Sequence, residues 1–121
     1  MDKRETGKKG ESLASEYLLK KGYDILGANY RKREGEIDII ARDGKTGEIV
    51  FVEVKSRRGI SCGYPEEAVD DLKIEKISGM AERWLEEKEM IDKPWRIDII
   101  AIETACHPPK ITHINNVTQD L

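Results

Sequence analysis

The sequence predicts an α/β fold in which a helix, three strands, a second helix and a further strand build a mixed central sheet. Three observations indicate this fold: an N-terminal stretch with helical spacing of apolar residues, two alternating segments joined by turn formers, and a second helical stretch followed by an isoleucine-rich segment. With 121 residues, of which 38% are hydrophobic, the chain can form one compact core. We therefore expect a single domain, 1–121.

The first helix is expected between residues 6 and 22. Gly22 stands where a C-terminal cap belongs, because glycine readily adopts the left-handed conformation that ends many helices. The apolar side chains that recur at helical spacings are Leu13, Ala14, Tyr17 and Leu18. Residues 23–29 then have the composition of a short strand, although Gly27 is uncommon inside a strand.

Two alternating strands are expected next, at 36–42 and 49–55, and the turn formers at 43–47 join them as a hairpin. On the first strand, the two expected faces are Ile37, Ile39 and Ala41, and Glu36, Asp38, Ile40 and Arg42. On the second strand, they are Val50, Val52 and Val54, and Ile49, Phe51, Glu53 and Lys55.

A second helix is expected after Pro65, and an isoleucine-rich strand follows it at 95–103. The apolar stripe of this helix is expected at Val69, Leu72, Ile77, Met80, Ala81, Trp84 and Leu85. A strand, a helix and another strand in succession predict a right-handed crossover that places the two strands parallel. A last short strand is expected around 110–114.

Polar pairs interrupt the two central strands at alternate positions: Glu36 with Asp38, and Glu53 with Lys55. The register that centres the hairpin on its turn sets Asp38 opposite Glu53, and Glu36 opposite Lys55. Directly opposed Cβ atoms lie about 5 Å apart, so the two carboxylates would meet beside an ammonium group. Two facing carboxylates repel, and a fold that keeps them together needs a proton, a cationic side chain or a metal ion between them.

Magnesium suits such a site, because this hard cation takes carboxylate oxygens and retains waters that a phosphate can replace. A metal held there can polarise a scissile phosphate and lower the pKa of an attacking water, while a lysine stabilises developing charge. Glu11 lies on the helical stripe with Ala14 and Leu18, so it is expected to point toward the sheet. Its alternative role is that of a first-turn glutamate that favours the helix dipole.

The simpler interpretation of the strand residues is a set of ordinary salt bridges on a solvated sheet face. It pairs Glu36 with Lys55, and Asp38 with Arg31 or Arg33. Apolar residues on the same face imply partial burial, where ionised groups are costly unless well partnered. Both interpretations remain open at this point.

Charge is unevenly distributed along the chain, although the formal net charge is only −3. Residues 1–33 hold nine Lys or Arg against five Asp or Glu, whereas 66–93 hold five against ten. The side chains that could contact nucleic-acid phosphates are Arg31, Lys32, Arg33, Arg57, Arg58, Lys73 and Lys76. The alternative is that these charges are solvated surface.

The cysteine content and the absence of a long apolar run indicate in which cell compartment the protein is expected. Two cysteines, Cys62 and Cys106, cannot form a disulfide framework or a four-thiolate zinc site, and reduced thiols are expected. No apolar run approaches the length of a membrane span and the first ten residues are polar, so we expect a cytoplasmic protein without a membrane partner.

The segment Gly-Glu-Ile-Asp-Ile-Ile-Ala at 35–41, followed by Val-Phe-Val-Glu-Val-Lys-Ser-Arg at 50–57, resembles the PD-(D/E)xK nuclease superfamily. It is most similar to the bacterial YraN family of uncharacterised endonuclease-like proteins, related in fold to Holliday junction resolvases. The match covers about residues 7–103 and leaves 104–121 as a C-terminal extension. The resemblance implies a restriction-endonuclease-like core of order αβββαβ.

The resemblance also implies roles for individual residues. Asp38 and Glu53 would bind the metal, Lys55 would be the catalytic lysine, Glu11 would assist metal binding, and Glu36 would be auxiliary. The implied cofactor is magnesium, with manganese as a substitute. Ile37 stands where the superfamily name has proline.

Three functions follow as hypotheses. The first is a metal-dependent endonuclease that hydrolyses phosphodiester bonds in DNA, including branched or structured DNA, for which a homodimer would supply paired cuts. The second is a non-catalytic nucleic-acid-binding protein that keeps the nuclease fold. The third is a protein-interaction domain whose carboxylates are structural and whose acidic second helix faces outward.

Overall fold

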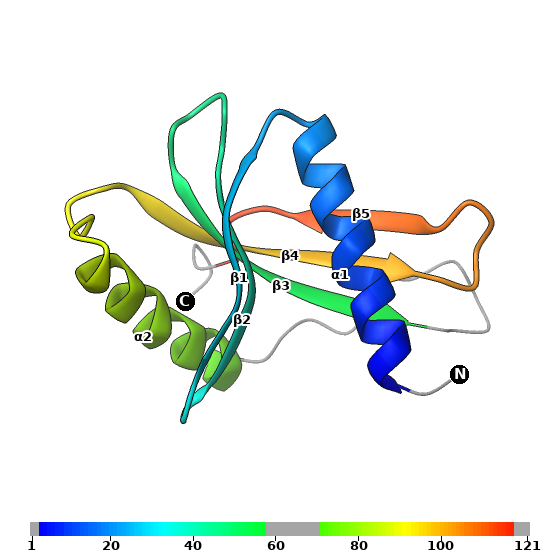
Figure 1. Cartoon of the computed structure of the whole chain (residues 1–121), viewed down its shortest axis with the longest axis horizontal. Helices are drawn as coiled ribbons and strands as arrows, with labels where there is room; N and C mark the ends of the chain where they lie inside the picture. Colours follow the sequence, from blue (N-terminus) through cyan, green and yellow to red (C-terminus); the bar gives the residue numbers. More distant parts are fainter. Residues whose placement is uncertain (1–2, 58–70, 118–121) are drawn as a thin grey trace.

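The computed structural model has the predicted α/β architecture (Figure 1). It describes the backbone of residues 3–57 and 71–117, and the side chains of 8–56 and 72–117. The elements are α1 (Lys3–Lys20), β1 (Asp24–Lys32), β2 (Gly35–Arg42), β3 (Ile49–Arg57), α2 (Asp71–Glu87), β4 (Trp95–Glu103) and β5 (Lys110–Ile114). The expected αβββαβ order is confirmed, and so is the last short strand expected around 110–114, which is β5.

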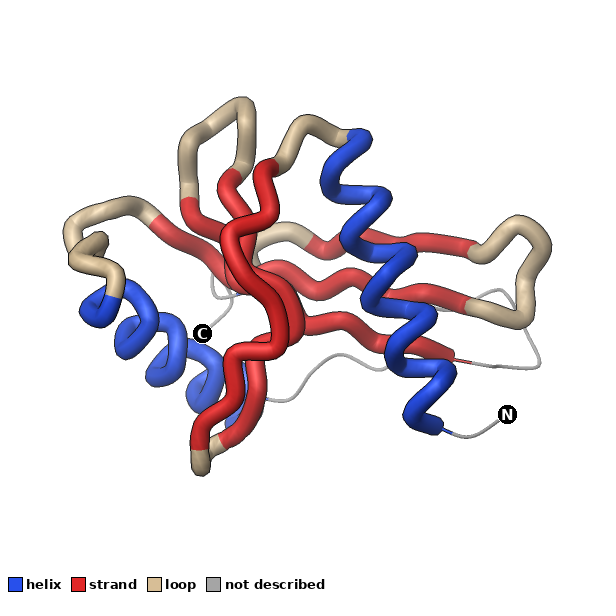
Figure 2. Tube along the Cα trace, viewed as in Figure 1, coloured by secondary structure: helices blue, strands red, loops and turns tan. Residues whose placement is uncertain are grey.

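The strands form one mixed sheet in the order β1-β2-β3-β4-β5 (Figure 2). β3 and β4 are parallel, whereas the other neighbouring pairs are antiparallel. α2 connects the two parallel strands, so the predicted β3–α2–β4 crossover is confirmed. β5 pairs with β4 from Glu103 opposite Lys110 to Ile99 opposite Ile114.

Gly22 ends α1 as the sequence predicts. Its φ of +92° is in the left-handed region, where glycine carries no steric penalty. The amide of Tyr23 donates to the carbonyl of Leu18 at 3.0 Å, and the amide of Gly22 donates to that of Leu19 at 3.1 Å. These two bonds form a Schellman cap, which turns the chain directly into β1.

The two helices cover opposite faces of the sheet. On the α1 side, the buried residues are Ala14, Leu18, Ile39, Ala41, Val50, Val52, Ile100 and Ile102. On the α2 side, they are Ile37, Ile40, Ile49, Phe51, Ile74, Ile77, Met80, Ala81, Trp84, Leu85, Ile97 and Ile99. Each of the larger side chains contributes roughly 1.5–3 kcal/mol by leaving water, so these two layers hold the helices on the sheet.

The apolar stripe of α2 differs from the prediction at its first turn. Leu72 is 61% exposed, whereas Ile74, which the predicted stripe omits, is buried. Leu72 precedes Ile77 by five residues and therefore points about 140° away from it around the helix. Val69 lies outside the described residues.

The predicted faces of β2 are wrong at Ile37. This residue packs with Ile40 on the α2 side, whereas Ile39 and Ala41 pack on the α1 side. Strict alternation would place Ile37 with Ile39, so the pattern shifts by one position between them. The shift coincides with the end of the β2–β3 ladder at Ile39. On the N-terminal side of Ile39, the β1–β2 hairpin bends away from the rest of the sheet (Figure 2).

The structure also bears on the expectations for membrane spans and for cysteines. No helix within the described ranges is long and apolar enough to cross a membrane. Cys106 is disulfide-bonded, so the expected reduced thiol is wrong at this position. Cys62 lies outside the described residues.

Candidate functional site

β2 and β3 separate after the pair Ile39–Val52, and a carboxylate occupies the point of separation. The predicted register holds from Arg42 opposite Ile49 up to this pair, but Asp38 is not paired with Glu53 as a strand neighbour. Instead, the main-chain amide of Val54 donates to Asp38 Oδ2 at 2.7 Å. The Asp38 carboxylate thus takes the place that a strand carbonyl would otherwise fill, which fixes its position.

The Glu53 carboxyl group lies beside that of Asp38. Both residues are buried, at 8% and 6% exposure, and their carboxyl groups lie close enough to interact electrostatically. Burial raises the pKa of Asp38 well above its usual range, and the charges of Glu53 and Glu11 act in the same direction. Two carboxylates this close repel each other, so the pair favours a proton or a cation beside it.

Lys73 supplies the positive charge on the other side of Glu53. Its Nζ lies 2.5 Å from Glu53 Oε2, an oxygen that accepts no well-angled hydrogen bond within the described residues. Lys73 sits in the first turn of α2, half-exposed, and reaches inward to a carboxylate that is almost wholly buried. The sequence predicts a phosphate contact for Lys73 instead. Its pairing with Glu53 joins two distant segments, and no local pattern indicates it.

Lys55 lies two residues after Glu53 on β3. It stands opposite Ala101 in the parallel ladder with β4 and is half-buried. Because side chains alternate along a strand, Lys55 and Glu53 project to the same side of β3. The expected catalytic lysine is therefore on the strand and face that carry the second carboxylate.

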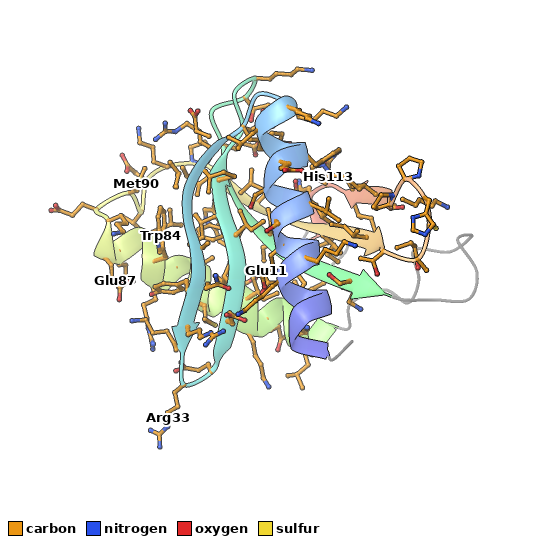
Figure 3. All side chains as sticks on the ribbon, turned by 45° about the vertical axis from the view of Figure 1, so that its right-hand side comes forward. Glu11, Arg33, Trp84, Glu87, Met90 and His113 are labelled. Atoms are coloured by element: carbon orange, nitrogen blue, oxygen red, sulfur yellow. The ribbon has the colours of Figure 1, made fainter. Side chains whose placement is uncertain are left out.

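Glu11 and Glu36 form a neighbouring acidic pair next to this site. Arg31 Nε donates to Glu36 Oε2 at 2.6 Å. The Asn29 amide, oriented to satisfy both carboxylates, donates to Glu11 Oε1 at 3.1 Å and to Glu36 Oε2 at 3.3 Å. Burial raises the pKa of Glu11, and the charge of Glu36 raises it further. Glu11 thus faces the sheet, as the helical stripe predicts (Figure 3).

A surface depression of about 490 Å³ joins Glu11 to Asp38 between α1 and the β1–β2 hairpin. Its lining residues are Lys8, Glu11, Ser12, Ser15, Glu16, Ala28, Asn29, Asp38 and Ile39. Asp38 therefore lines a depression on the α1 side, while its neighbour Glu53 contacts α2 through Lys73.

The donor atoms of this site suit magnesium better than a softer metal. Asp38 and Glu53 offer hard carboxylate oxygens, and magnesium usually takes one or two carboxylates while keeping several waters. Among residues 8–56 and 72–117, no three His, Cys, Asp or Glu side chains gather closely enough to hold a metal by themselves. The pair therefore fits a site completed by water and substrate, and Glu11 stands outside a preformed three-carboxylate set.

Comparison with known sequences places the chain in a family. Residues 10–102 match the model of Uncharacterised protein family UPF0102. The chain belongs to this family. UPF0102 is the YraN family, so the resemblance found in the sequence is confirmed.

Other UPF0102 proteins match almost the whole chain. A UPF0102 protein of Geotalea uraniireducens is 46% identical over 116 residues, covering 95% of this chain and 90% of the relative. One of Geobacter metallireducens is 49% identical over 110 residues, covering 91% and 88%. One of Nocardia farcinica is 42% identical over 120 residues, covering 96% and 91%.

The described basic residues of this UPF0102 protein have different surroundings. Arg31 pairs with Glu36, while Lys32 Nζ lies 3.5 Å from Glu87 Oε2 on α2. Arg33 projects from the tip of the β1–β2 hairpin (Figure 3). Lys76 is exposed on α2. The side chain of Arg57, and all of Arg58, lie outside the described residues.

A second polar cluster, centred on the buried Arg96 of this UPF0102 protein, lies near the beginning of β4. Arg96 contacts Asp98 at 3.0 Å, Asp43 at 3.0 Å and Glu48 at 2.6 Å. His113 Nε2 lies 2.8 Å from Asp98 Oδ2. His113 is not among the site residues predicted from the sequence. It lies in a short strand next to the exposed Ile114, and that position gives no indication of a buried partner.

Proposed function

We propose that this protein is a metal-dependent endonuclease that hydrolyses phosphodiester bonds in DNA, including branched or otherwise structured DNA. The observation that supports this function most is the meeting of two buried carboxyl groups, Asp38 and Glu53, where β2 and β3 separate. Lys55 follows on the same face of β3. Two buried acids side by side are costly to the fold, which favours a functional reason for them.

In this proposal, Asp38 and Glu53 hold magnesium, or manganese in its place. The ion, when bound, polarises the scissile phosphate and lowers the pKa of a bound water. The Val54 amide holds the Asp38 carboxylate where β2 and β3 separate, so the carboxylate needs little reorganisation to bind the metal ion. Lys55 contributes an ammonium group that stabilises negative charge developing on the phosphate.

The surrounding residues act through charge and position. Glu11 and Glu36 add negative potential beside the Asp38–Glu53 pair, which raises the local concentration of cations. The set assigned to DNA phosphates is Arg31, Lys32, Arg33, Arg57, Arg58, Lys73 and Lys76. Lys73 in this role would leave Glu53 for the phosphate once a metal ion takes the carboxylate.

A cleavage assay tests this function. The purified protein is incubated with magnesium or manganese and with linear, single-stranded or four-way-junction DNA. Cleavage is expected in the wild type, lost in Asp38→Asn, and retained in Asp92→Asn, a control that removes one exposed carboxylate from the α2–β4 loop. The proposal is wrong if no substrate is cut, or if Asp38→Asn cuts as fast as wild type.

A second candidate is a nucleic-acid-binding protein that does not cut. The observation that favours it is the Lys73 ammonium group, which already pairs with the Glu53 carboxylate where a metal ion would bind. Such a protein would bind DNA with an affinity that falls as salt rises, because phosphate contacts release counterions. Salt-dependent binding without turnover in either metal would favour this candidate over the endonuclease.

A further inference from the structure

A pocket of about 310 Å³ lies between the β1–β2 turn and the first half of α2. Its lining residues are Glu34, Gly35, Glu36, Leu72, Lys73, Lys76, Ile77 and Met80. It adjoins the carboxylate pair from two sides, because Lys73 contacts Glu53 and Glu36 precedes Asp38 by two residues on β2. A molecule in this pocket would therefore lie beside the proposed scissile phosphate.

The pocket has an apolar wall with cations on its rim. Leu72, Ile77 and Met80 form the wall, and Leu72 is 61% exposed because it lies off the stripe that packs on the sheet. Lys73 and Lys76 flank that wall on α2. Apolar surface next to ammonium groups matches a nucleotide, whose base has apolar faces and whose backbone carries negative charge.

The opposite wall is the tight end of the β1–β2 hairpin. Lys32 pairs with Gly35, so only two residues form the turn, and Gly35 has a φ of +154° that other residues rarely adopt. A Cβ on Gly35 would lie 3.6 Å from Met80 Sδ, so the hairpin backbone runs along the pocket. Glu34 and Glu36 also line the pocket, and their carboxylates pair with Arg83 and Arg31. A carboxylate has further lone pairs that can accept hydrogen bonds from base amino and imino groups.

We propose that this pocket binds one unpaired nucleobase of the DNA strand that is cut, while Lys73 and Lys76 contact the adjacent phosphates. The inference rests on the proposed function, since it assigns the pocket to the strand at the Asp38–Glu53 site. A base in an intact duplex is stacked and paired, and extracting it costs free energy. The pocket therefore selects single-stranded, branched or mismatched DNA over regular duplex.

The test measures DNA binding in EDTA, so that it does not depend on turnover. Fluorescence anisotropy is recorded with a fluorescein-labelled single-stranded oligothymidylate, with a strand of equal length that has abasic sites, and with a duplex. Leu72→Ala removes the exposed part of the apolar wall. Ile91→Ala is the matched control, because Ile91 is likewise exposed, at 55%, and does not line the pocket.

We expect the single strand to bind more tightly than both the abasic strand and the duplex. Leu72→Ala should weaken single-strand binding about three- to tenfold, bring it close to abasic-strand binding, and leave the duplex unaffected. Ile91→Ala should bind all three probes as the wild type does. Melting temperatures equal to wild type within a degree or two would show that neither variant is misfolded.

Three results would overturn the inference: equal affinity for normal and abasic strands, tighter binding of the duplex, or unchanged binding in Leu72→Ala. The proposed function fails separately, through the cleavage assay. A protein that cuts nothing but shows the Leu72-dependent preference for bases keeps the pocket and loses the endonuclease. A protein that cuts duplex and single strands alike, without that preference, does the reverse.

Discussion

Asp38 and Val54 are joined across the point where β2 and β3 separate, with Asp38 Oδ2 accepting the Val54 amide at 2.7 Å. One side chain thus does two things: it satisfies a main-chain donor that lost its strand partner, and it presents a carboxyl group to Glu53. A substitution at Asp38 therefore affects stability and the proposed chemistry separately, according to what the new side chain retains.

Asp38→Ala should destabilise the fold more than Asp38→Asn. Alanine leaves the Val54 amide without its acceptor, which costs roughly 1–3 kcal/mol for a buried donor. Asparagine keeps an acceptor oxygen and removes the repulsion with Glu53. Urea unfolding measures both free energies, and equal losses in the two variants would contradict the structural role of this bond.

Lys73 and Glu53 should show energetic coupling in a double-mutant cycle. Lys73→Ala leaves a buried carboxylate without its cation, whereas in Glu53→Gln the same change removes no charge pair. Because Lys73 is half-exposed, the coupling free energy should be on the order of 1 kcal/mol. Lys88→Ala, an exposed site after the end of α2, is the control and should show no coupling to Glu53.

Acid should weaken the fold partly through Asp98. Burial opposes the charged form of this carboxylate, but bonds from His113, Arg96 and the Asn116 amide outweigh burial and hold its pKa below the usual 3.8. Its charge therefore stabilises the folded state above pH 3.8, and that contribution is lost as the pH falls through the lower folded-state pKa.

The matching measurement is the free energy of unfolding of wild type and Asp98→Asn from pH 6 down to about pH 2. The variant should be less stable at neutral pH, because Arg96 loses a buried partner, but its stability should fall less steeply below about pH 4. Parallel curves for the two proteins would exclude this contribution of Asp98.

Gly10→Ala should destabilise the packing of α1 on β3. A Cβ at Gly10 would lie 1.6 Å from Ser56 Oγ and 2.9 Å from Ser56 Cβ, so the helix or the strand must shift, at a cost of roughly 1–3 kcal/mol. Ser56→Gly in the same chain should recover most of the loss. Gly79→Ala is the control: nothing lies within 4 Å of its Cβ, and this change in α2 should raise stability by roughly 0.5–1 kcal/mol.

Most of the fold follows from local patterns. Apolar spacing predicted both helices, the alternation at 36–42 and 49–55 predicted the central hairpin and its register near the turn, and Gly22 predicted the end of α1. These features depend on neighbours within a few positions of the sequence, where side-chain periodicity reports directly on burial. β1 extends beyond the predicted 23–29 to Lys32, because pairing with β2 overrides the low strand propensity of this segment.

The sequence by itself determined which chemical groups the candidate site could contain, since the spacing of Asp38, Glu53 and Lys55 on two adjacent strands is local information. Only the tertiary structure decided how they meet: the β2–β3 ladder ends at Ile39, Asp38 caps the Val54 amide, and Lys73 reaches Glu53 from α2. These contacts join different segments of the chain, and the periodicity within one strand does not predict which segments meet. Their geometry depends on where the sheet splits and where a distant helix packs, and neither is encoded in the spacing of residues along one strand.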